Sequence, residues 1–123
     1  MTVIQLRKNI LKLSAALFLF QNSGLAIAHH GWSEYDQTQQ LTLNGKIVQS
    51  GYEHPHGFVK LSIDGKTWTA VLAPPFRMEN RGLNNSAIAV GATIRLEGYP
   101  HRSKSDEMRA ERIIVNGKSI ELR

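Results

Sequence analysis

The 123-residue chain contains no cysteine. No disulfide can therefore brace it, and no thiolate can act as a nucleophile or as a metal ligand. Any metal site must use histidine, carboxylate or backbone donors. The sequence also lacks a Ser-His-Asp order, a glycine-rich phosphate loop and a paired-carboxylate motif, so nothing in it specifies an enzyme.

Long hydrophobic runs are scarce as well. The main apolar stretch, Leu13 to Phe20, is well short of the roughly 20 residues that a membrane-spanning helix needs. It follows Arg7, Lys8 and Lys12, and it precedes the small residues of Ala26-Ile27-Ala28. A positive segment, an apolar segment and small residues before a cut predict a secretory signal peptide over residues 1–28, cleaved after Ala28 or, alternatively, after Ala26.

Cleavage changes the composition of the chain. The formal net charge of the full sequence is +5, and it falls to +2 without the three basic residues of the leader. This small charge is spread along the chain, whereas nucleic-acid binders usually cluster Lys and Arg on one face. We therefore expect no nucleic-acid partner. Residues 29–123 form one small domain, which we expect in the periplasm with no stable membrane span in the mature form.

The mature segment has the pattern of β-strands separated by turns. We expect strands over residues 41–48, 58–63 and 67–72, then a turn at Gly91 and a strand within residues 90–99. Residues 108–122 predict two more strands separated by a turn at Asn116-Gly117. Asp64-Gly65 is a preferred two-residue hairpin turn, and Gly45 suggests a bend or bulge inside the first strand. Pro74-Pro75 ends the third strand. Residues 76–82 then predict one or two helical turns that Gly82 closes.

A short helix between the third and fourth strands is typical of the OB-fold, a small Greek-key barrel. We therefore predict an all-β, OB-fold-like domain, with a five- or six-stranded sandwich as the alternative. This topology decides where the histidines lie. His54 and His56 follow the first strand, and His101 follows the fourth. In OB-folds these two loops flank one ligand-binding face.

The pair His29-His30 begins the mature chain if cleavage follows Ala28. A free α-amine has a pKa near 8, so it can bind a metal together with the His29 ring, in the chelate known as a histidine brace. One further imidazole would complete it, with His56 or His101 as the candidates, and His30 and His54 are additional candidate metal ligands. If cleavage follows Ala26, His29 is the third residue and forms a square-planar chelate with the amine and the intervening amides, which favours Cu(II) or Ni(II). Copper heads the affinity order for such nitrogen donors, and zinc is the competitor.

The order of several motifs resembles DUF6152, a family of exported bacterial domains of unknown function. The resemblance rests on "AHHGWSEYD", "LTLNGKIV", "HPHG", "GATIRLEGYPHR" and "RAERIIVNGK", and it spans essentially all of residues 28–123. It implies that His29, His30 and His56 are family-typical positions. His54 stands where the family commonly has asparagine. The resemblance implies a small exported domain and supplies no activity.

A non-metal function is the alternative: an adaptor or ligand-binding domain for a peptide, a glycan or a periplasmic partner protein. Tyr52 and Arg102, beside the histidine loops, are then the candidate rim residues. Five arginines suggest an anion site, of which Arg102 is the most suggestive, but interleaved acidic residues favour a solvated surface of mixed charge. The five are Arg77, Arg81, Arg102, Arg109 and Arg112. Trp68, between apolar neighbours, is expected in the core.

Overall fold

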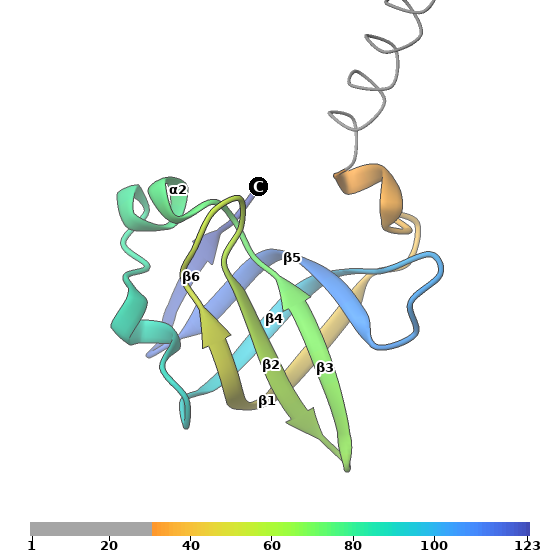
Figure 1. Ribbon diagram of the computed structural model, residues 1–123, viewed down its shortest axis with the longest axis horizontal. Helices are drawn as coiled ribbons and strands as arrows, with labels where there is room; N and C mark the ends of the chain where they lie inside the picture. Colours follow the sequence, from red (N-terminus) through yellow and green to blue (C-terminus); the bar gives the residue numbers. More distant parts are fainter. Residues whose placement is uncertain (1–30) are drawn as a thin grey trace, which may run out of the picture. The chain divides into compact units, whose positions relative to one another are not determined.

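The computed structural model describes residues 31–123 (Figure 1). The predicted signal peptide, His29 and His30 lie outside the described residues. Six strands, one short α-helix and two 3-10 helices follow in this order: η1 (Trp32–Glu34), β1 (Leu41–Gly51), β2 (Phe58–Ile63), β3 (Lys66–Val71), α2 (Pro75–Asn80), η2 (Asn85–Ile88), β4 (Thr93–Pro100), β5 (Glu107–Val115) and β6 (Lys118–Glu121). In the part of the chain that the structure describes, no helix is long and apolar enough to cross a membrane.

The strands form one sheet that closes on itself. Its order is β3-β2-β1-β4-β5-β6, and all of these neighbours are antiparallel. A parallel pairing of β3 with β5, from Thr69–Glu107 to Val71–Arg109, closes the barrel. The ring β1-β2-β3-β5-β4, with α2 between β3 and β4, is the OB-type arrangement, so the predicted fold is confirmed.

Two tight turns set the register of the hairpins. Asp64 and Gly65 have φ of 49° and 77°, and Asn116 and Gly117 have φ of 51° and 73°. Positive φ at both central residues matches the right-handed twist of the flanking strands, which explains the preference for Asp-Gly and Asn-Gly. Both predicted turns are therefore present. The strand after the first turn begins and ends one residue earlier than predicted, at Lys66 and Val71.

The expected irregularity in the first strand lies elsewhere than predicted. The register between β1 and β2 shifts between Ile47 and Gln49, while Gly45 pairs regularly with Ile94 of β4. The prediction of a bulge at Gly45 is therefore wrong. The glycine meets a packing need instead, because a Cβ at this position would lie 2.9 Å from Cγ1 of Ile63.

The short helix α2 is fixed at both ends and from one side. Pro75 occupies its first turn, where a missing N–H costs nothing, and Gly82 follows its end with φ of 87°. Arg77 donates to the carbonyl of Leu122 at 3.2 Å, and Arg81 donates to that of Glu121 at 2.8 Å. These bonds attach the helix to the last strand of the chain.

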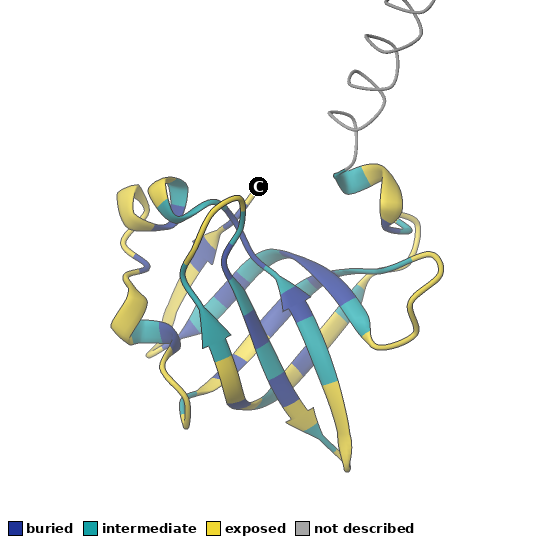
Figure 2. Cartoon of the chain, in the orientation of Figure 1, coloured by how far each residue is buried: buried dark blue, intermediate teal, exposed yellow. Residues whose placement is uncertain are grey.

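The core takes aliphatic side chains from every strand, together with Met78 of α2. Figure 2 shows the buried positions along the strands. The largest fully buried members of the core include Ile47, Leu61, Leu96 and Ile113. Trp68, expected in the core, is partly buried against it, and Nζ of Lys66 lies 4.2 Å from the centre of its ring.

Candidate functional site

The structure places the three described histidines in different surroundings. His54 is exposed on the β1–β2 loop, next to a cis peptide bond to Pro55. His56 is half-buried at the end of that loop, and the side chain of His101 is only 8% exposed. Within residues 31–123, no group of three or more His, Asp or Glu side chains is arranged to hold a metal ion.

His101 organises the β4–β5 loop. Its Nδ1 accepts hydrogen bonds from the backbone N–H groups of Ser103 and Lys104, each at 3.1 Å. A neutral imidazole that accepts at Nδ1 carries its proton on Nε2. This Nε2 lies 3.9 Å from a carboxylate oxygen of Glu107 and 4.0 Å from one of Glu34. A metal at Nε2 would force the proton onto Nδ1, against two N–H donors, so the geometry favours a structural role for His101.

The two predicted rim residues also bond to their own chain. The Tyr52 hydroxyl lies 2.7 Å from the carbonyl oxygen of Leu83, to which it donates, and 3.2 Å from a carboxylate oxygen of Glu79. Nε of Arg102 donates to the carbonyl of Ser33 at 3.0 Å. Tyr52 thus attaches the helix region to β1, and Arg102 attaches the η1 segment to the β4–β5 loop. That either of them binds a ligand stays a prediction.

The unusual feature of the molecule is Arg109, on β5. Its neighbours Met108 and Ala110 belong to the core, so strand alternation turns Arg109 to the outside of the barrel. Nevertheless it is only 6% exposed. The Trp32 ring covers it, with the guanidinium carbon 4.6 Å from the ring centre. Nη2 of Arg109 lies 3.1 Å from Nε2 of His56.

The protonation states around Arg109 follow from this burial. Burial lowers the pKa of His56, and the nearby positive charges of Arg109 and Arg77 lower it further. His56 is therefore neutral at neutral pH, and its Nε2 can accept a hydrogen bond from Arg109. Burial also lowers the pKa of Arg109, but arginine stays charged in any folded protein at neutral pH.

Trp32 lies against a second arginine as well. The guanidinium carbon of Arg123 lies 4.4 Å from the centre of its ring, and the edge of the ring meets Tyr99 at 6.2 Å between centres. Arg77 completes the group through its charge, which acts on both His56 and Arg109. We call His56, Arg109, Trp32, Arg77 and Arg123 the Arg109 centre. It brings together the β1–β2 loop, β5, α2 and both ends of the described chain.

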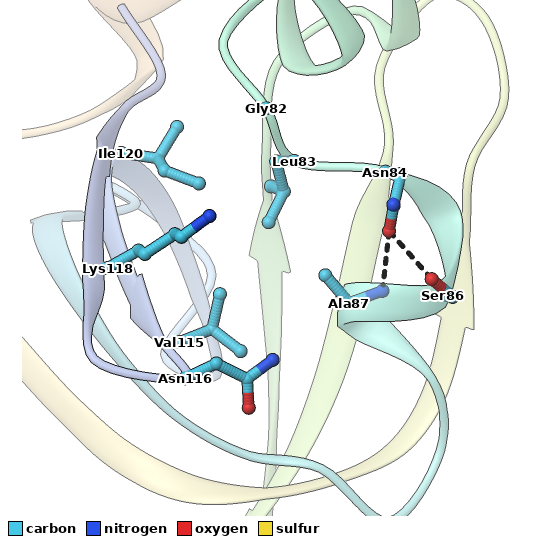
Figure 3. Close-up of a pocket in the computed structure, with 9 residues that line it drawn as sticks. All are labelled: Gly82, Leu83, Asn84, Ser86, Ala87, Val115, Asn116, Lys118 and Ile120. Carbon is cyan, nitrogen blue, oxygen red and sulfur yellow. Dashed lines mark hydrogen bonds between the residues drawn. The ribbon is translucent and has the colours of Figure 1, made fainter.

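A separate cavity of about 270 Å³ lies between the segment after α2 and the β5–β6 hairpin (Figure 3). None of the predicted site residues lines it. Its Asn84 side chain accepts hydrogen bonds from the Ala87 backbone N–H at 3.1 Å and from the Ser86 hydroxyl at 2.7 Å, and so caps η2. Its remaining lining residues are Gly82, Leu83, Val115, Asn116, Lys118 and Ile120.

Fold and site together define a small OB-type barrel whose outer surface carries a cluster of residues around the buried Arg109. Residues 17–109 match DUF6152, a family of unknown function. The match covers more than half of the chain, and the chain belongs to this family, as the motif order predicted. A search of curated proteins found no match.

Solved structures with similar folds are distant in sequence. One is the crystal structure of a complex of TiaS with tRNA and ATP, with 15% identity and a TM-score of 0.49 over 72% of this chain and 20% of that chain. The chain thus corresponds to only a fifth of that protein. Another is OBody AM1L10 bound to hen egg-white lysozyme, with 15% identity and a TM-score of 0.49 over 72% of this chain and 93% of that chain.

Proposed function

We propose that the mature chain is a small periplasmic protein that binds Cu(II) through nitrogen donors at its processed N-terminus. The position of Trp32 is the observation that supports this. Trp32 lies on Arg109, whose Nη2 is 3.1 Å from His56. His29 precedes Trp32 by three residues in the sequence, and an extended chain spans about 3.3 Å per residue, so the processed N-terminus can reach at most about 10 Å from Trp32. We assign His56 as the described imidazole that joins it, because Nδ1 of His101 already accepts two backbone hydrogen bonds.

The protonation states favour this assignment. The lowered pKa of His56 leaves its ring neutral, so a metal at Nε2 would replace the hydrogen bond from Arg109 and would not have to displace a proton from a charged imidazolium. The terminal amine, with an ordinary pKa near 8, also deprotonates readily. Copper exceeds zinc in affinity for such donors. Three arginines nearby oppose a divalent cation, so the His29 amine and ring must supply most of the binding free energy, with His30 as a further candidate ligand.

The test begins with the mature N-terminus, determined by mass spectrometry on protein exported with its own leader. Cu(II) is then titrated under EPR. We expect nitrogen hyperfine coupling from the amine, the His29 ring and His56. His56→Gln should remove one coupled nitrogen, and the matched variant His54→Gln, on the same loop, should leave the spectrum unchanged. One extra residue before His29 should abolish the brace. Equal, weak binding by all forms would refute the proposal.

A non-metal function, as a binding domain for a peptide, a glycan or a partner protein, is the second proposal. Tyr52 and Arg102 lend it little support, because their polar groups bond to their own chain. The observation that favours it is the buried charge of Arg109. This proposal predicts that chelators and replacement of His29 leave ligand binding unchanged.

A further inference from the structure

The buried charge of Arg109 has fewer hydrogen bonds and ion pairs than buried charges in proteins normally have. It is the one charged residue among residues 31–123 that is buried, and its Nε is buried without a hydrogen-bond partner. No ion pair recorded within the described residues includes Arg109, and its recorded hydrogen bond goes to the neutral ring of His56. Buried charges in proteins are normally paired, and an unsatisfied buried donor needs an explanation.

The charges around this group favour an anion. Arg77 and Arg123 add two guanidinium groups, and both act on Arg109 through their charge. Two carboxylates oppose them: Glu34 acts on Arg109, and Glu111 lies 3.5 Å from Nη1 of Arg123. Among the described residues, these three guanidinium groups outnumber the two carboxylates that act on them. This excess favours a monoanion over a phosphate dianion.

We propose that the Arg109 centre binds the carboxylate group of a small organic acid. A carboxylate oxygen would accept a hydrogen bond from the unpartnered Nε–H of Arg109. A carboxylate oxygen matches a guanidinium N–H in charge and geometry, and such charge-assisted bonds are stronger than neutral ones. The ring centre of Trp32 lies 4.6 Å from the guanidinium carbon, so this aromatic side chain adds an apolar surface beside the charge for the hydrocarbon part of the ligand. This inference goes beyond copper binding and needs no metal.

The experiment uses the full mature protein, labelled with ¹⁵N and freed of metal with EDTA. Sodium acetate is titrated against sodium chloride and sodium phosphate at constant ionic strength, while NMR follows the Nε–H signal of Arg109. We expect acetate to move this signal saturably, and chloride and phosphate to act at least about tenfold more weakly. The Trp32 indole signal should follow the acetate curve, because the ring lies on the same guanidinium.

Variants separate the site from general charge attraction. Arg109→Lys keeps the charge but removes the N–H that the carboxylate would bond, and should weaken acetate binding about tenfold to a hundredfold. Arg123→Gln changes a side chain that is 46% exposed, so folding should survive, and acetate binding should weaken severalfold. Arg112→Gln is the matched control, because Arg112 lies on β5 as Arg109 does. Its guanidinium pairs with Glu97 at 3.1 Å, and acetate binding should be unchanged.

Two results would overturn the inference. One is an Arg109 signal that does not respond saturably to acetate. The other is equal acetate binding by the wild type and by Arg123→Gln. Because the titration is free of metal and the copper titration needs no acetate, either proposal can fail while the other stands.

Discussion

The hydroxyl of Tyr52 offers a direct test of whether this residue serves the fold or a ligand. It is half-buried and donates to the carbonyl of Leu83 at 2.7 Å. Tyr52→Phe removes this bond and keeps the ring packed against the core. A hydrogen bond contributes about 1 kcal/mol net, so we expect the free energy of unfolding to fall by about that amount. For a domain of this size this corresponds to a Tm lower by about 4–8 °C.

The measurement is urea unfolding followed by tryptophan fluorescence, with an unchanged m value as the sign that only stability has changed. A loss of less than about 0.5 kcal/mol, which is the usual effect of a surface substitution, would show that our interpretation of Tyr52 as a structural residue is wrong.

Three further predictions concern pH, close packing and the core. The pKa of His56 is lower in the folded protein than in the unfolded chain. As the pH falls below about 6.5, His56 is therefore protonated in the unfolded chain before it is protonated in the folded one. Stability measured by urea unfolding should therefore decline from pH 7 to pH 5, and His56→Gln, but not His54→Gln, should flatten this decline. A Cβ on Gly98 would collide with the backbone carbonyl oxygen of Arg109 and would lie 2.9 Å from the backbone Cα of Ala110, so Gly98→Ala should cost about 3 kcal/mol or more. Leu61→Ala should cost about 2–5 kcal/mol in the same assay, because Leu61 is fully buried.

The order of the elements could be predicted because local chemistry determines it. Asp64-Gly65 and Asn116-Gly117 mark turns, and Pro75 and Gly82 bound the helix, whatever the rest of the chain does. The bulge could not be located in this way. A glycine in a strand indicates either a bulge or a close contact, and the contact of Gly45 is with Ile63, which is distant in the sequence.

The site could be predicted only in part, for a similar reason. The sequence interpretation included Arg109 among five arginines but preferred Arg102, because Arg102 is adjacent to His101. Alternation along β5 indicates only that Arg109 points away from the core. Its burial depends on Trp32 and His56, which reach it from other parts of the chain. Side-chain burial of this kind comes from tertiary packing, which a strand pattern does not contain.

The parallel pairing of β3 with β5 has a consequence for the behaviour of the protein at high concentration. An unpaired strand edge is a template on which another molecule can add its own strand and start an aggregate. Here β3 and β5 pair with each other along part of their edges. The outermost strand is β6, which has only four residues. Lys118 and Glu121 place a charge at each end of it. Short, charged edges resist such growth, so the domain should remain monodisperse where an open sheet would form fibres.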